Sequence, residues 1–81
     1  MVMKNITIYS TPTCTYCQMA KEFFKQNGVA FTEYNVADDL PKRQEMIEKS
    51  GQMGVPVIVI ENDIIVGFDK GRIAQTLGIA A

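Results

Sequence analysis

The sequence predicts a small α/β domain with the element order β-α-β-α-β-β-α, in which a mixed four-stranded sheet is flanked by three helices. Two stretches in the first half alternate apolar and polar side chains, and a segment of helical periodicity separates them. Later, residues 55–60 form an almost continuous apolar run that a short turn joins to another apolar stretch. With 81 residues, 47% of them hydrophobic and 21% charged, the chain corresponds to a single folded domain over 1–81.

The first half of the chain predicts a βαβ unit. Residues 4–10 (KNITIYS) alternate and are rich in β-branched side chains, which indicates a strand that ends before Pro12. Residues 15–27 carry apolar side chains at helical spacing, and Gly28 follows as the stop of that helix. Residues 29–36 (VAFTEYNV) alternate again and indicate a second strand. Such a unit predicts parallel strands joined by a right-handed crossover.

A second helix is predicted over residues 40–50 (LPKRQEMIEKS), because helix signals occur at both of its ends. Asp38 or Asp39 is suited to the N-cap, where a carboxylate accepts hydrogen bonds from the first free N–H groups. Pro41 falls in the first turn, where its missing N–H costs no hydrogen bond, and Gly51 ends the helix.

A hairpin and a short helix complete the predicted fold. The apolar run at residues 55–60 is typical of a strand that is covered on both faces. The polar residues 61–63 form a tight turn into residues 64–68, which are predicted to pair with that strand in antiparallel fashion. The last helix starts near Asp69 and places apolar side chains one turn apart.

Charge and hydropathy exclude several classes of function. The net charge is −1 and the basic residues are scattered, so nothing attracts nucleic acid or anionic lipid. The longest apolar run is far too short to span a bilayer, and the N-terminus enters a strand pattern without a secretory signal. The sequence therefore predicts a cytoplasmic monomer that binds neither nucleic acid nor membrane.

The only two cysteines, Cys14 and Cys17, lie three positions apart in TPTCTYCQMA, where a strand gives way to a helix. Inert packing, half of a zinc site and a redox pair are the alternatives. A closed zinc site needs four ligands, and the chain has no histidine and no second cysteine pair, so no metal is predicted. A permanent disulfide closing so short a loop stabilises little and is rare in a reducing compartment. The redox hypothesis is therefore favoured.

The start of a helix gives the two thiols different roles. Residues three apart in a helical turn have Cα atoms about 5–6 Å apart, which a disulfide tolerates. Free N–H groups and the helix dipole favour a thiolate at Cys14, whereas Cys17 lies one turn further, on the core side. Cys14 is thus predicted to attack a disulfide, and Cys17 to resolve the mixed disulfide that forms. Lys21 and Lys25 are interpreted as part of a solvated helix face.

Three motifs together resemble the glutaredoxin family of the thioredoxin-fold superfamily. They are STPTCTYC at 10–17, MGVPVIVI at 53–60 and VGFDKG at 66–71. Their order and spacing are similar to those of the family over essentially the whole chain, and most similar to the short bacterial glutaredoxin-like redoxins. The resemblance implies a thioredoxin-like fold and thiol-disulfide oxidoreductase activity. It also implies glutathione as co-substrate with no bound cofactor, and disulfide-containing or glutathionylated proteins as partners.

The resemblance implies roles for the residues around the dithiol. Cys14 and Cys17 match the family's dithiol pair, and Tyr16 stands at its usual aromatic position. Val55–Pro56 matches the family's Val-Pro, whose peptide bond is cis. In the family this arrangement lets the valine backbone hydrogen-bond the cysteinyl part of a bound thiol peptide. From the residues alone, Pro56 also fits a proline at the start of a strand.

The remaining glutathione-binding positions follow from the same resemblance. Gly67, Phe68 and Asp69 match the stretch that receives the γ-glutamyl end of glutathione, through N–H groups at the start of the last helix. Gln52 matches the position that holds the glycyl carboxylate. Taken without the family, Asp69 also predicts an N-cap, Phe68 a core residue and Gln52 a solvated loop amide.

Four positions depart from the family pattern. Thr15 replaces the proline between the cysteines, Thr11 a lysine, Gly54 a threonine and Val66 a glycine. These departures affect the glutathione site more than the dithiol, which leaves two alternatives open. One is a redoxin reduced by a flavoprotein disulfide reductase, such as thioredoxin reductase, that donates electrons to ribonucleotide reductase. The other is a module in which the first cysteine and glutathione hold a [2Fe–2S] cluster between two protomers.

Overall fold

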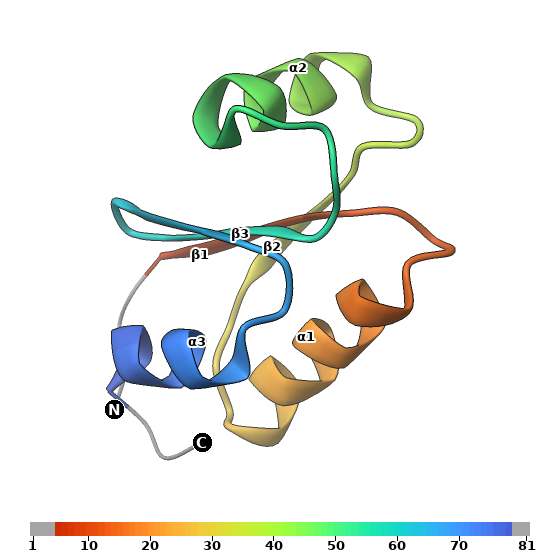
Figure 1. Ribbon diagram of the computed structural model, residues 1–81. Helices are drawn as coiled ribbons and strands as arrows, with labels where there is room; N and C mark the ends of the chain where they lie inside the picture. Colours follow the sequence, from red (N-terminus) through yellow and green to blue (C-terminus); the bar gives the residue numbers. More distant parts are fainter. Residues whose placement is uncertain (1–4, 79–81) are drawn as a thin grey trace.

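The computed structural model describes residues 5–78 and confirms the predicted fold class and order of elements (Figure 1). The elements are β1 (Ile6–Ser10), α1 (Thr15–Gln26), β2 (Thr32–Asn35), α2 (Leu40–Ser50), β3 (Val57–Ile60), β4 (Asp63–Val66) and α3 (Lys70–Leu77). The predicted start of the first strand at Lys4 lies outside the described residues, as do the ends of the 1–81 domain range. Among residues 5–78, no helix is long and apolar enough to cross a membrane.

The sheet brings the site-bearing loops together at one end. Its strand order is β2-β1-β3-β4, with β1 parallel to β2 and antiparallel to β3, and β3 antiparallel to β4. The register pairs Tyr9 with Val57 and Val57 with Val66. The end of β1, the start of β3 and the end of β4 therefore lie side by side. The cysteine segment follows β1, Val55–Pro56 precedes β3, and residues 67–69 follow β4.

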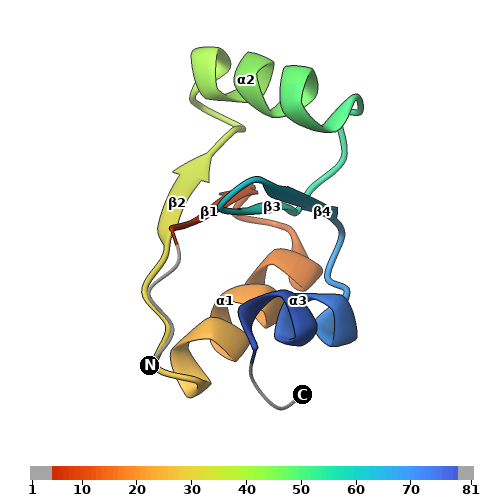
Figure 2. The same cartoon turned by 90° about the vertical axis from the view of Figure 1, so that its left-hand side faces the viewer.

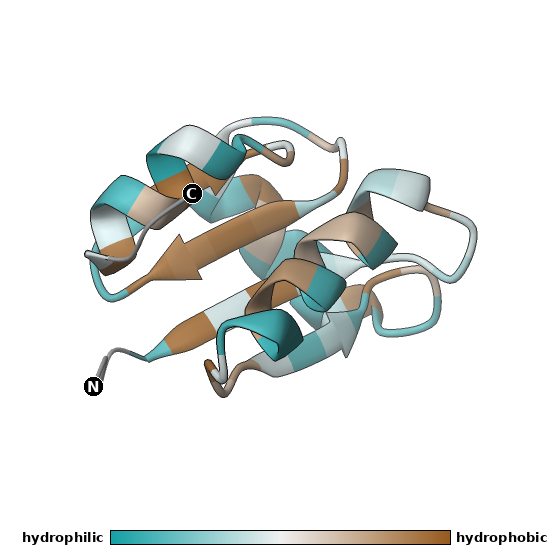
Figure 3. Cartoon of the chain, turned by 90° about the horizontal axis from the view of Figure 1, so that it is seen from below, coloured by the Kyte–Doolittle hydropathy of each residue, from teal (hydrophilic) through white to brown (hydrophobic). Residues whose placement is uncertain are grey.

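The helices cover the two faces of the sheet unequally. α1 and α3 pack on one face and α2 on the other, as Figure 2 shows from the side. From below, Figure 3 shows apolar residues along the strands beneath α1 and α3. The core under these two helices includes Ile8, Ala20, Phe24, Ile58 and Ile73, whereas the smaller core under α2 contains Tyr9, Val36, Met46 and Val57. Because side chains of a strand alternate between faces, β1 contributes to both cores.

The structure identifies the N-cap of α2 and shows that β2 is shorter than predicted. Asp39, not Asp38, is the N-cap of α2, and its Oδ1 accepts a hydrogen bond from the Lys42 backbone N–H at 3.1 Å. β2 starts later than the predicted residue 29, because the Val29 N–H donates to the Phe24 carbonyl at 2.9 Å. The backbone of residue 29 is thus bonded to the last turn of α1 and not to a neighbouring strand. An alternating sequence pattern does not reveal this local contact.

The hairpin strands are also shorter than predicted at the end where the site lies. β3 starts after Pro56, which has no N–H to offer a neighbouring strand. β4 ends at Val66, because Gly67 adopts a φ of +84° and turns the chain. The Gly67 N–H donates to the Pro56 carbonyl at 2.8 Å, which joins the two loops.

Candidate active site

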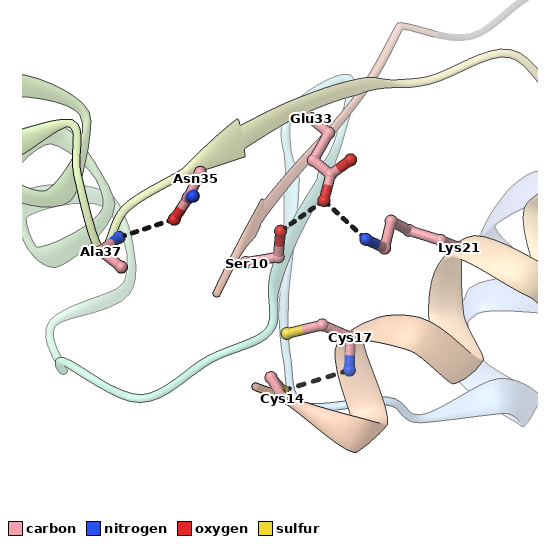
Figure 4. A network of polar contacts seen from close by, with 7 residues as sticks. All are labelled: Ser10, Cys14, Cys17, Lys21, Glu33, Asn35 and Ala37. Carbon is pink, nitrogen blue, oxygen red and sulfur yellow. Dashed lines mark hydrogen bonds and ion pairs between the residues drawn. The ribbon is translucent and has the colours of Figure 1, made fainter. Parts of the chain in front are cut away.

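Cys14 caps the first turn of α1 with its own sulfur. Its backbone is extended, and its Sγ accepts a hydrogen bond from the Cys17 backbone N–H at 3.1 Å (Figure 4). Its N–H donates to the Thr11 carbonyl at 3.3 Å, so the loop after β1 fixes its position. The side chain is half-buried and stays accessible. The Cys14 sulfur therefore lies at the N-terminal end of α1, where a substrate sulfur can reach it.

Cys17 differs from Cys14 in its burial and in its position within the helix. It is fully buried in α1, and both cysteines are free thiols. Burial raises the pKa of Cys17 to about 12, and the hydrogen bond of its thiol to Cys14 raises it as well. Cys17 therefore remains protonated at neutral pH. The structure thus has the asymmetry that the sequence predicted for a nucleophile and a resolving thiol.

A polar network lies beside Cys17. Lys21 Nζ donates to Glu33 Oε2 at 2.7 Å, and the Ser10 hydroxyl donates to the same oxygen at 2.8 Å (Figure 4). The Lys21 side chain is only 16% exposed, so its interpretation as a solvated face is wrong, whereas Lys25 is exposed as expected. Both bonds hold the pKa of Glu33 below its usual value. Sequence periodicity missed this network, because the contact of α1 with β2 depends on the crossover between them.

Most of the residues predicted to bind glutathione surround one open pocket. The pocket has a volume of about 330 Å³ and is lined by Tyr16, Val55, Pro56, Val66, Gly67, Phe68 and Asp69. Tyr16 is 62% exposed, and the Val55–Pro56 peptide bond is cis. Residues far apart in the sequence thus meet at the sheet end where β3 starts and β4 stops.

Gln52 is the exception among these predicted residues. Its Nε2 donates to the Gly54 carbonyl at 3.0 Å, and its Oε1 accepts from the Gly54 N–H at 2.6 Å. It does not line the pocket. A Cβ on residue 54 would lie 2.6 Å from Gln52 Oε1, so the glycine lets the amide close onto the loop. The replacement of the family's threonine by Gly54 was the sequence signal for this arrangement.

Backbone groups around the pocket are free to bind a ligand. Within the described chain, the Val55 N–H and C=O make no hydrogen bond, and neither do the N–H groups of Phe68 and Asp69. The Asp69 carboxylate caps α3 by accepting from the Arg72 N–H at 3.2 Å. The Phe68 ring packs edge-on against Phe23, with centroids 6.0 Å apart. Asp69 is therefore an N-cap and Phe68 a partly buried core contact, while their N–H groups remain available.

A nucleophilic sulfur at a helix start, a buried partner thiol one turn away and an adjacent pocket with free backbone groups define a dithiol oxidoreductase. Its sheet and helix arrangement is that of the thioredoxin-like fold. Such a site exchanges thiols for disulfides without a metal or a histidine base, because the reaction needs only a thiolate and an acceptor disulfide.

Comparison with known proteins assigns this class more closely. The glutaredoxin family model matches residues 6–65. An uncharacterized glutaredoxin-like 8.6 kDa protein in the rubredoxin operon of Clostridium pasteurianum is 53% identical over 72 residues, covering 89% of this chain and 96% of that protein. Glutaredoxin 3 of Escherichia coli K12 is 42% identical over 67 residues, covering 83% and 81%. The crystal structure of a mutant of the thioredoxin-like protein BC3987 has a TM-score of 0.89 at 33% identity, covering 96% and 100%. The chain belongs to the glutaredoxin family and is a thiol-disulfide oxidoreductase.

Proposed function

We propose that this protein is a dithiol glutaredoxin that reduces protein disulfides and glutathione mixed disulfides, with glutathione as its co-substrate. The observation that carries the proposal is the Cys14 sulfur, which accepts the Cys17 N–H at 3.1 Å next to a pocket with unpaired backbone groups. We place this activity in the cytoplasm, where thiols are kept reduced, and expect the protein to act as a monomer.

The proposed reaction exchanges sulfur partners in two steps. The Cys14 thiolate attacks a substrate disulfide, forming a mixed disulfide and releasing one substrate sulfur as a thiolate. Cys17 then attacks Cys14 Sγ, which releases the second substrate sulfur and leaves a Cys14–Cys17 disulfide. Two glutathione thiols restore the dithiol by the same exchange and become glutathione disulfide. Two electrons thus pass from glutathione to the substrate.

Free backbone groups support the proposed glutathione site. The Val55 N–H and C=O are suited to pair with the cysteinyl main chain of glutathione in the manner of an added strand. The unpaired N–H groups of Phe68 and Asp69, at the start of α3, are suited to the γ-glutamyl carboxylate. Tyr16 lines the pocket from the first turn of α1, and Gln52 contributes by holding Gly54 in place.

The two cysteine variants test this function. Cys14→Ser is expected to be inactive on every substrate, because the nucleophile is lost. Cys17→Ser is expected to retain turnover of a glutathionylated peptide, since glutathione itself can resolve that mixed disulfide, but to lose reduction of a protein disulfide. Both activities are measured with glutathione, glutathione reductase and NADPH consumption. Full activity of Cys14→Ser would contradict the assignment of the nucleophile.

A flavoprotein reductase as electron source is the second candidate function. It is favoured by Thr11, which supplies no cation for the glycyl carboxylate, and by Gln52, whose amide is already bonded to Gly54. Parallel assays compare glutathione plus glutathione reductase with thioredoxin reductase, at equal concentrations of this protein. We expect faster turnover with glutathione. Turnover that depends on thioredoxin reductase and is indifferent to glutathione would replace the first proposal by the second.

A further inference from the structure

The Ser10–Glu33–Lys21 network is not explained by packing or by the glutathione pocket. All three residues line a second open pocket, of about 420 Å³, which shares no residue with the pocket around Tyr16. Ser10 is only 1% exposed, yet it directs its hydroxyl to a carboxylate. Lys21 loses most of its exposure to reach the same oxygen. Burying an ammonium group is costly unless it is paired, so the position of Lys21 is set by its partners.

The network lies next to the resolving thiol. Lys21 follows Cys17 by four positions in α1, so the two side chains are neighbours on one side of the helix. Figure 4 shows the Cys17 side chain directed from α1 toward the end of β1, where Ser10 lies. The backbone N–H of Thr11, the next residue, faces the Cys17 sulfur and favours its thiolate, as does the charge of Lys21.

The resolving step needs Cys17 as a thiolate, whereas the reduced protein keeps Cys17 protonated. In the reduced protein, burial, the hydrogen bond to Cys14 and the charge of Cys14 all keep Cys17 protonated. Once Cys14 forms a mixed disulfide, its sulfur is neutral and a poor acceptor, so two of these causes disappear. Burial still opposes ionisation, and the groups left to offset it are the Thr11 N–H and the Lys21 ammonium.

We propose that Lys21, positioned by Glu33 and Ser10, stabilises the Cys17 thiolate while it attacks the Cys14 mixed disulfide. This inference rests on the proposed function, because it concerns the second step of the same exchange. Cys17 loses its proton to solvent, and its sulfur forms a bond to Cys14 Sγ. The bond from Cys14 to the substrate breaks, and its electron pair leaves on the substrate sulfur, which then takes up a proton. Lys21 acts through Cys17 and touches no substrate atom.

The charged groups around Cys17 come from three segments. The cysteine loop contributes Cys14, α1 contributes Lys21, and β2 contributes Glu33, whose carboxylate is already bonded to Lys21. Lys25 lies one turn further along α1 and is exposed, and its charge acts on Glu33. Replacement of Lys21 therefore removes the cation of this network. Replacement of Lys25 changes the net charge by the same amount but leaves the network intact. Lys25 is the matched control.

A chromogenic aromatic disulfide, 5,5′-dithiobis(2-nitrobenzoate), separates the two steps in one rapid-mixing trace. Attack by Cys14 releases one coloured thiolate, and resolution by Cys17 releases the other. We compare wild type, Lys21→Gln, Lys21→Arg and Lys25→Gln between about pH 6 and pH 9, the range in which perturbed thiols ionise. The first phase reports on an intact nucleophile in each variant, and the second reports on the resolving thiol.

We expect Lys21→Gln to slow the second phase about tenfold at neutral pH and to move its pH profile up by about one unit, the effect of one pKa unit on the thiolate fraction. The first phase should be unchanged, Lys21→Arg should restore the second phase, and Lys25→Gln should resemble wild type. The inference is overturned if the second phase of Lys21→Gln equals that of wild type, if Lys25→Gln slows it as much, or if both phases fall together. Absence of a second phase in wild type would instead contradict resolution by Cys17, and with it the proposed function.

Discussion

At the scale of single residues, the two cysteines show how one backbone position changes the chemistry of a side chain. Cys14 precedes α1, and its sulfur accepts a hydrogen bond from the N–H of Cys17, the third residue of the helix, whereas the Cys17 side chain is buried in the core. The position of Cys14 was predictable, because a strand, a proline and a helix pattern fix where α1 begins. The hydrogen bond between the two residues follows from that position, as an N-cap accepts from the residue three positions on.

The raised pKa of Cys17 predicts a loss of stability in alkali. The thiol of an unfolded chain ionises at about pH 8.5, while burial holds the folded pKa at about 12. The contribution of Cys17 to the free energy of unfolding is therefore complete below about pH 8.5. Between about pH 8.5 and the folded pKa of about 12, this contribution falls by about 1.4 kcal/mol for each pH unit. Urea unfolding under reducing conditions, at about pH 8 and about pH 10, measures this loss.

Cys17→Ala is the control for the alkaline loss, because it leaves the other titrating groups in place. We expect its free energy of unfolding to fall less than that of wild type between the two pH values. The difference between the two slopes isolates Cys17 from tyrosines and lysines, whose titration both proteins share. Equal slopes would mean that Cys17 ionises as easily in the folded protein as in the unfolded chain.

At the scale of elements, the site depends on how helices start and strands stop. α1 begins at the nucleophile, and α3 begins at the N–H groups proposed to bind a carboxylate. Gly67, with a φ of +84°, makes the turn between β4 and α3 that a residue with a side chain adopts only at a cost. Helix starts were predictable from the pair Asp38 and Asp39, from Asp69 and from the first cysteine, although the sequence did not decide between the two aspartates. The strand ends were not, because they depend on Pro56, on Gly67 and on which backbone groups find a partner across the sheet.

The caps of α2 and α3 offer a matched pair of variants. Asp39 accepts from the Lys42 N–H at 3.1 Å and Asp69 from the Arg72 N–H at 3.2 Å. Replacement of either by alanine is expected to cost about 1 kcal/mol of unfolding free energy, and replacement by asparagine very little. Only Asp69→Ala should also raise the KM for glutathione, because α2 lies on the other face of the sheet. Chemical unfolding and steady-state kinetics check the two parts, and an equal rise in KM for Asp39→Ala would contradict the placement of the glutathione site.

Side-chain pairs between elements were beyond sequence reasoning. Lys21 belongs to α1 and Glu33 to β2, and their contact at 2.7 Å depends on how the crossover sets the helix over the strand. Gln52 and Gly54 close a small loop through two hydrogen bonds of the Gln52 amide. Periodicity identifies which face of an element is buried, but it does not rank polar partners on that face. The residues named from the family resemblance line one pocket, except Gln52, and their binding of glutathione stays a prediction.

At the scale of the whole molecule, two cores of unequal size share one sheet. The core under α1 and α3 contains Phe24 and the smaller core under α2 contains Met46, and both side chains are fully buried. β1 and β3 contribute side chains to both cores. The faces are therefore expected to unfold together, as one domain over the 1–81 range.

Truncation of either core tests this cooperativity. Phe24→Ala is expected to cost about 3–5 kcal/mol and Met46→Ala about 2–5 kcal/mol, a large share of the stability of a domain of this size. Because the faces share strands, each variant should show one transition that coincides by circular dichroism and tyrosine fluorescence. Non-coincident transitions in Met46→Ala would show that α2 unfolds separately from the rest.

The β3–β4 turn lies at the end of β3 opposite Pro56. The Glu61 N–H donates to the Asn5 carbonyl at 2.9 Å, and the Asn5 N–H donates to Glu61 Oε1 at 3.1 Å. These two bonds hold the turn against the residue that precedes β1. A loop that is exposed, already closed by its own neighbours and remote from the thiols is a natural insertion point for a fluorescent reporter. A biosensor built there leaves the catalytic end of the sheet untouched.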